Sequence, residues 1–140
     1  MRPRRPAPSE QMLCAAQTLA RFMATGDGSG LKDLFAAEGV VIVENFAPFV
    51  FAGPDAFERW REGFVEHVDR DGLEDLAWRF GEAQDFALAG ELAYFVLPTT
   101  WTGRSHGLPF SEDGGWAFVL EADGPRWRIR SYAWAVTAKP

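Results

Sequence analysis

One carboxylate stands in a stretch of sequence that offers it little water. Four β-branched residues, Val40 to Val43, lead directly into Glu44, and the loop that follows as far as Gly53 is almost entirely apolar. Because an ionised carboxylate isolated in apolar surroundings is costly, Glu44 must be hydrated, paired or protonated. An apolar setting raises a carboxyl pKa toward the range useful for a general base. The alternatives are an exposed charge at a strand end and a structural pair with an arginine.

The last expected strand carries basic and aromatic residues that could face such an acid. Strand alternation places Arg128, Arg130, Tyr132 and Trp134 on one face of it. If this face lines a pocket, Arg130 would pair with Glu44 or bind an anionic ligand. If it does not, the arginines face solvent or a dimer interface.

Two further acids, Glu112 and Asp113, lie in a Gly-rich segment that we expect to form a long loop over residues 103–115. A solvated position is the ordinary outcome for acids in a loop. The sharper hypothesis is that Glu112 is a second acid that faces Glu44.

His67 falls on the shoulder of the apolar face of an expected helix. A histidine in this position would serve as a proton shuttle. More often it is an ordinary residue near the end of a helix, where the helix dipole and Asp71 favour its charge. His67 and His106 have no metal-ligand spacing with each other or with an acid, so we predict no metal. The sequence has no dinucleotide-binding motif, and we predict no cofactor.

Aromatic residues are numerous, with 12 Phe and 6 Trp in 140 residues. Aromatic side chains at these spacings belong to a core more often than to a ligand site. The surplus nevertheless favours a pocket for a flat apolar or aromatic ligand, or a hydrophobic dimer interface. The candidate pocket walls are Phe49, Trp60, Tyr94, Trp116, Tyr132 and Trp134.

The composition predicts one globular domain, since 47% of the residues are hydrophobic and the length allows a real core. A net charge of −6 argues against nucleic acid and anionic membranes as partners. Cys14 is the single cysteine, which excludes an internal disulfide, and we expect it to be buried. Residues 1–8 are basic and Pro-rich and are predicted to form a disordered arm before a domain of residues 9–140, in a cytoplasmic protein.

Hydrophobic periodicity predicts helices first and strands afterwards. The helices are expected over residues 10–25, 31–35 and 54–71. The strands are expected over residues 40–44, 76–80, 93–102, 116–121 and 127–135, with a hairpin turn at residues 89–91. The first strand should be buried on both faces. This order is typical of an α+β fold, with a curved antiparallel sheet and helices on one face.

Three segments are distinctive in their order along the chain. They are ARFMATGDGSGLKDLFAAEGVVIVEN (residues 20–45), GPDAFERW (53–60) and WRIRSYAW (127–134). Together they resemble the nuclear transport factor 2-like superfamily, in its SnoaL-like and ketosteroid-isomerase-like branch. The resemblance implies a cone, in which a curved antiparallel sheet wraps three N-terminal helices around a hydrophobic pocket. It also implies a SnoaL-like domain over residues 9–140 and a homodimer formed through the sheet.

The isomerase site carries over only in part. Its general base corresponds to Glu44 or Asn45, of which only Glu44 can titrate. The tyrosine that stabilises an enolate corresponds to Leu19, and the neutral acid corresponds to a position close to Gly115. Because losing one such donor typically costs about 10²–10³ in rate, we do not expect ketosteroid isomerase activity.

These observations favour a small-molecule pocket protein, an acid–base isomerase, cyclase, lyase or hydrolase that acts on an apolar metabolite without a cofactor. Glu44 would take or relay the proton, and Tyr94 or Tyr132 would donate a hydrogen bond. The expected partners are a small apolar or aromatic molecule and a second copy of the chain. The alternative is a non-catalytic ligand-binding or dimerisation module on the same fold, to which the fold alone would not assign a function.

Overall fold

The computed structural model describes residues 6–139, so most of the predicted arm, residues 1–8, lies outside the described residues. The described chain contains two α-helices, a 3-10 turn and seven strands. They are α1 (Glu10–Thr25), η1 (Lys32–Leu34), β1 (Val41–Val43), β2 (Val50–Phe51), α2 (Ala56–Arg70), β3 (Leu73–Phe80), β4 (Gln84–Ala89), β5 (Leu92–Ser105), β6 (Leu108–Asp123) and β7 (Arg126–Ala138). No described helix has both the length and the apolar character that a membrane crossing requires.

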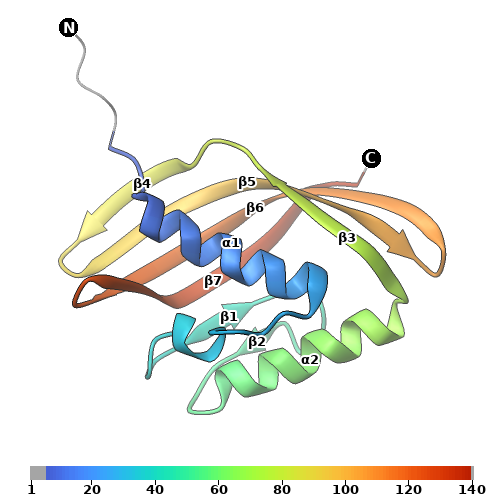
Figure 1. Ribbon diagram of the computed structural model, residues 1–140, viewed down its shortest axis with the longest axis horizontal. Coiled ribbons are helices and arrows are strands. Elements are labelled where there is room, and N and C mark those ends of the chain that lie inside the picture. The colour runs from blue at the N-terminus through green and yellow to red at the C-terminus, as the bar shows by residue number, and fades with distance from the viewer. Residues whose placement is uncertain (1–5, 140) are drawn as a thin grey trace, which may run out of the picture.

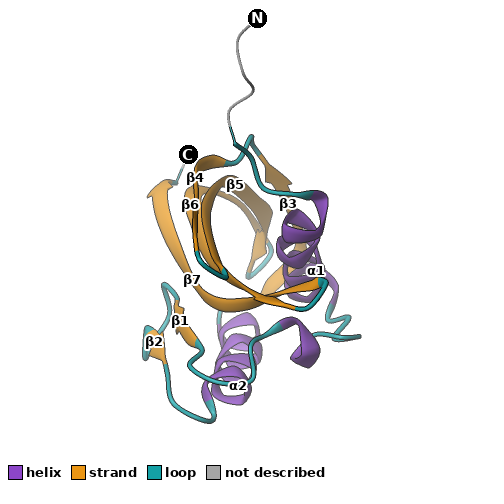
Figure 2. Cartoon of the chain, turned by 90° about the vertical axis from the view of Figure 1, so that its left-hand side faces the viewer, coloured by secondary structure: helices purple, strands orange, loops and turns teal. Residues whose placement is uncertain are grey.

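The strands form one curved sheet in the order β2-β1-β7-β6-β5-β3, with β4 paired to β5 as well (Figure 1). All pairings are antiparallel except that of β1 with β7, which is parallel. The sheet curls without closing, α1 packs against β3 and β7, and α2 packs against the β1, β2 and β3 end (Figure 2). This α+β cone confirms the fold predicted from the sequence.

Helix α1 buries one stripe of small and apolar side chains against the sheet. Its buried residues are Met12, Ala15, Ala16, Leu19, Ala20 and Phe22. Ser9 caps the first turn by accepting a hydrogen bond from the backbone N–H of Met12 at 3.3 Å. Cys14 falls outside this stripe and is exposed beside Thr18, so the prediction that it is buried is wrong.

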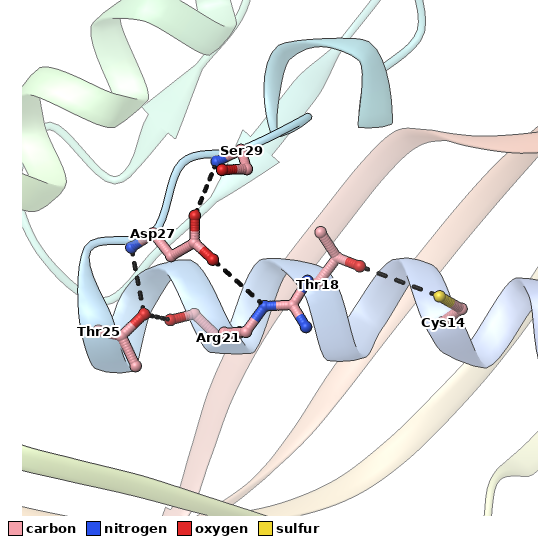
Figure 3. Close-up of polar contacts among 6 residues, drawn as sticks. All are labelled: Cys14, Thr18, Arg21, Thr25, Asp27 and Ser29. Carbon is pink, nitrogen blue, oxygen red and sulfur yellow. Dashed lines mark hydrogen bonds and ion pairs between the residues drawn. The ribbon is translucent and has the colours of Figure 1, made fainter.

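Helix α1 ends at Gly26, whose φ of 77° lets its N–H bond the carbonyl of Phe22. The turn that follows is fixed by Asp27, which accepts a hydrogen bond from the N–H of Ser29 and lies 3.8 Å from Arg21 (Figure 3). The hydrogen bonds from Ser29 hold the pKa of Asp27 below its usual value. This turn carries the chain from α1 to η1.

The second expected helix, residues 31–35, is a single 3-10 turn, Lys32–Leu34. Leu31 and Phe35 are both buried, and Phe35 forms an isolated parallel bridge to Ile129 of β7. Leu31 and Phe35 therefore pack into one end of the core rather than form the apolar face of a helix.

Strand β1 is buried on one face only, against our expectation. Ile42 is fully buried, whereas Val41 and Val43 are 38% and 37% exposed on the outer side of the sheet. The inward phase of β1 runs from Val40 through Ile42 to the next residue in step, Glu44, which is buried too. The alternation of the strand thus carries the carboxylate inward.

The segment 103–115 is not the expected long loop, because it forms the extended ends of β5 and β6 and the tight turn between them. Two of its glycines, Gly103 and Gly114, allow close approach of neighbouring strands. A Cβ atom on Gly103 would lie 2.9 Å from the carbonyl oxygen of Glu74, and one on Gly114 would collide with that of Ala135. Glycines that look like loop residues in the sequence are here required by strand packing.

Candidate active site

Glu44 lies at the wall of a cavity of about 480 Å³ between the helices and the curled sheet. Only 6% of the residue is exposed, although it is a carboxylic acid. Helix α2 contributes Phe64 and His67 to the lining, β6 contributes Glu112 and Trp116, and β7 contributes Trp134. The burial that we expected from the apolar residues around Glu44 is therefore present.

Two buried donors hold one oxygen of this carboxyl. The indole Nε1–H of Trp60 donates to Oε2 of Glu44 at 2.9 Å, and the hydroxyl of Tyr132 donates to the same oxygen at 2.6 Å. No hydrogen bond joins Oε1 to any described residue. Because Oε2 already accepts two hydrogen bonds, the proton of the neutral acid belongs on Oε1.

The surroundings of Glu44 raise its pKa from an ordinary 4.5 to about 7. Burial is the main cause, the hydrogen bonds from Tyr132 and Trp60 oppose it, and the negative charge of Glu112 raises the pKa further. Burial and the neighbouring Glu44 raise the pKa of Tyr132 well above its usual value, so this phenol stays a donor. Glu44 is consequently a group that can both accept and donate a proton near neutral pH.

Glu112 lines the same cavity from β6, in step with Gly114 and the buried Trp116 on the inner face of the sheet. Its side chain is 22% exposed, and its carboxylate lies 3.8 Å from the ammonium of Lys139. The second acid is thus on a strand rather than on a loop, and its charge acts on Glu44.

His67 also lines the cavity, stacked on Phe46 with 4.6 Å between the ring centroids. Its Nδ1 lies 3.0 Å from a carboxylate oxygen of Asp71 but makes no hydrogen bond. Burial lowers the pKa of His67, an effect that Asp71 partly opposes, so the imidazole is mostly neutral at neutral pH. Within residues 6–139, no three His, Cys, Asp or Glu side chains are grouped so that they could hold a metal ion.

The prediction that Arg130 pairs with Glu44 is wrong. The ladder between β6 and β7 shifts register between Val119 and Leu120, and as a result Ile129 and Tyr132 both point inward although three positions separate them. Arg130 instead donates to Glu121 at 2.9 Å and to the carbonyl of Gly39 at 3.0 Å, away from the cavity.

The aromatic candidates divide into three groups. Trp116 and Trp134 line the cavity, while Trp60 and Tyr132 lie behind Glu44 as its hydrogen-bond donors. Tyr94 is 37% exposed and Phe49 is 56% exposed, and neither lines the cavity, so their placement as pocket walls is wrong.

Several lining residues were missed in the sequence, because nothing local marks them. Met23, Phe110 and Lys139 reach the cavity from three separate elements or their ends. Asp71, at the C-cap of α2, also lines the cavity, and its contact with His67 could be predicted from their spacing of four residues.

Comparison with protein-family models and with curated proteins gives no match. Solved structures do resemble the chain. An NTF2-like superfamily protein from Salmonella enterica serovar Typhimurium has a TM-score of 0.70 at 12% identity, with 89% of this chain and 87% of that chain covered. An NTF2-like protein of unknown function in nutrient uptake, from Rhodospirillum rubrum, has a TM-score of 0.67 at 20% identity, with 92% and 100% covered.

A third similar structure is a hexachlorocyclohexane dehydrochlorinase, LinA type 2, with a TM-score of 0.71 at 6% identity and coverage of 93% of this chain and 85% of that chain. Sequence identities this low carry no information about substrate or activity. The TM-scores, together with the curled sheet and its two helices, establish that this chain has the fold of the nuclear transport factor 2-like superfamily.

Proposed function

We propose that this protein binds a small, largely apolar metabolite and transforms it by acid–base chemistry without a cofactor, as in the SnoaL-like and ketosteroid-isomerase-like branch of its fold. The reaction would be an isomerisation, cyclisation, elimination or hydrolysis. One observation carries the proposal: a buried carboxyl with a pKa of about 7 has one oxygen fixed by two donors and the other without a partner at the wall of a cavity.

In the proposed reaction, Oε1 of ionised Glu44 removes a proton from the bound molecule. Trp60 and Tyr132 keep the carboxyl in one orientation, so little reorganisation is needed when the proton moves. A pKa near the working pH leaves a large fraction of the base ionised and still basic enough to act. The proton then returns to another atom of the molecule from Oε1, or passes through His67, which lines the same cavity.

The proposed chemistry differs from ketosteroid isomerisation in its hydrogen-bond donors. Leu19, at the position of the isomerase tyrosine, is completely buried in the core, so no phenol reaches the substrate from α1. The buried Nδ1 of His67 and Nε1 of Trp116 belong to residues of the cavity wall and have no hydrogen-bond partner among the described residues. A ligand that bonds them would recover hydrogen bonds that the folded chain leaves unmade.

The similar structures include an enzyme that carries out elimination chemistry on this fold. One of them is a dehydrochlorinase, an enzyme whose name describes the removal of a proton and a chloride from its substrate. The proposal for this chain nevertheless depends on its own Glu44, since fold and function are separable.

A nitrobenzisoxazole tests the proposal without knowledge of the natural substrate. When a base removes the ring C–H proton of this neutral compound, the N–O bond breaks and a coloured phenolate with a nitrile forms. We expect the protein to accelerate this ring opening above the buffer rate, with a rate that rises with pH through about 7 and then levels. No acceleration at any pH would favour a non-catalytic module.

We also propose that two copies associate through the outer face of the sheet. Two rows of small or apolar side chains cross four neighbouring strands there. One row is Val43, Ala133, Ala117 and Val96, and the other is Val41, Ser131, Val119 and Tyr94. Val41, Val43 and Tyr94 are each more than a third exposed, so association would bury apolar surface.

Sedimentation of the purified chain checks this association. We expect the mass of a dimer for the native protein and the mass of a monomer for Ala117→Arg, which places a charge at the centre of one row. Leu108→Arg is the matched control, because Leu108 is 71% exposed at the β5–β6 turn and lies outside both rows. A native monomer at micromolar concentration would contradict the proposal.

A further inference from the structure

The charges around the cavity are unbalanced. Three of the described lining residues are acids, Glu44, Asp71 and Glu112, and the single lining residue with an ammonium or guanidinium group is Lys139. Lys139 is 69% exposed and lies 3.8 Å from Glu112, so it neutralises that acid only weakly. Arg130, which could have supplied a positive charge, pairs with Glu121 outside the cavity. An anionic ligand would therefore meet repulsion from the wall.

Three tryptophans, Trp101, Trp116 and Trp134, belong to the same wall. The ring centroids of Trp101 and Trp116 are 6.1 Å apart, and those of Trp116 and Trp134 are 6.2 Å apart with the rings nearly perpendicular. Rings at such angles present both faces and edges to one space. The face of an indole attracts a cation, more strongly where water is excluded.

We propose that the natural ligand carries an ammonium group on an apolar or aromatic body, with the ammonium held between Glu112 and these tryptophans. This inference rests on the proposed function, because it names the class of substrate for the same cavity. The apolar body would then lie toward Phe46 and Phe64, and Glu44 would be left to move the proton.

Glu112 is a better counter-ion than Glu44 for such a ligand. Oε2 of Glu44 is already occupied by its two donors, and ionising this carboxyl is costly because it is buried. Glu112 is partly exposed, and its contact with Lys139 is a long one between side chains. An ammonium on the ligand would replace the ammonium of Lys139 beside Glu112 with little rearrangement.

The binding of a cation should be linked to proton release. The charged and titratable groups around Glu44 are Tyr132 behind it, His67 on α2 and Asp71 at the C-cap of α2, Glu112 on β6, and Lys139 beyond β7. His67 is mostly neutral near pH 7, so Glu44 is the group that changes charge there. A positive ligand favours the ionised form of Glu44, and its affinity should rise as the pH increases through about 7.

Three probes of similar size separate charge from shape. They are 2-phenylethylammonium, the neutral 2-phenylethanol and the anionic 3-phenylpropanoate, each titrated into the native protein by calorimetry at pH 8. We expect the cation to bind about tenfold more tightly than the alcohol, and the anion to bind most weakly. Equal affinity for cation and alcohol, or a preference for the anion, would overturn the inference.

Glu112→Gln and Glu121→Gln form a matched pair of variants with the same change in net charge. Glu121 lies on the same strand but pairs with Arg130 outside the cavity. We expect Glu112→Gln to remove most of the preference for the cation and Glu121→Gln to keep it, with circular dichroism confirming that both variants are folded. A cation preference that survives Glu112→Gln would overturn the assignment of the ammonium site.

The two proposals fail separately. Ring opening of a neutral nitrobenzisoxazole requires Glu44 but no cation site, so its persistence without a cation preference would overturn only this inference. Cation binding that persists without ring opening would support this inference and overturn the catalytic proposal.

Discussion

Replacement of Glu44 by glutamine is expected to slow the ring opening of a nitrobenzisoxazole by about 10²–10⁴-fold, the range typical for loss of a general base. The amide oxygen of glutamine can still accept the hydrogen bonds from Trp60 and Tyr132, so the fold and the cavity should persist. Only the capacity to take a proton is lost. Steady-state rates measured from pH 5 to 9 give both the size of the loss and the disappearance of the pH dependence near 7.

The Glu112→Gln variant is the control for this experiment. It keeps the base but removes a negative charge that raises the pKa of Glu44, so its rate should rise at a lower pH than that of the native protein. If Glu44→Gln retained the native rate, ring opening would occur elsewhere in the molecule and Glu44 would not be the base.

The second large effect concerns stability, because a buried acid with a raised pKa makes folding depend on pH. The folded chain binds a proton at Glu44 up to a pH of about 7, whereas the unfolded chain releases it near 4.5. The contribution to stability is therefore fully present below pH 4.5 and is lost as the pH rises to about 7. Its size is about 3 kcal/mol of unfolding free energy.

Urea unfolding of the native protein and Glu44→Gln at several pH values isolates this contribution. The stability of the variant relative to the native protein should increase by about 3 kcal/mol between pH 4.5 and 7 and then stay constant. Other groups, including His67, cancel in this difference because both proteins contain them. Parallel stability curves for the two proteins would show that Glu44 has an ordinary pKa in the folded chain.

The burial of Glu44 could be predicted from the sequence because it depends on neighbours along the chain. Apolar residues precede and follow it, and the alternation of β1 carries it inward after Val40 and Ile42. Its partners could not be predicted in the same way. Trp60 and Tyr132 lie 16 and 88 positions further along, and we expected Trp60 only as a pocket wall and Tyr132 as a possible donor to a ligand.

The errors on the strands share one physical cause, which is contact with neighbouring strands. Gly103 and Gly114 predict a loop when each is considered alone, but they are positions where an adjacent backbone or ring leaves no room for a side chain. The predicted position of Arg130 assumed that side chains alternate without interruption along β7. A register shift in the β6–β7 ladder places Arg130 on the side away from the cavity instead. Neither effect leaves a trace in local hydrophobic periodicity.

Titration of the Glu44 carboxyl carbon by NMR, with the signal assigned from its loss in Glu44→Gln, tests most directly whether the cavity holds an acid tuned for proton transfer. Tyr132→Phe should raise the midpoint further, since it removes a donor to the carboxylate, whereas Tyr94→Phe on the outer face should not change it. For the native protein we predict a midpoint at a pH of about 7. A midpoint near the ordinary 4.5 would contradict the assignment of Glu44 as the catalytic base.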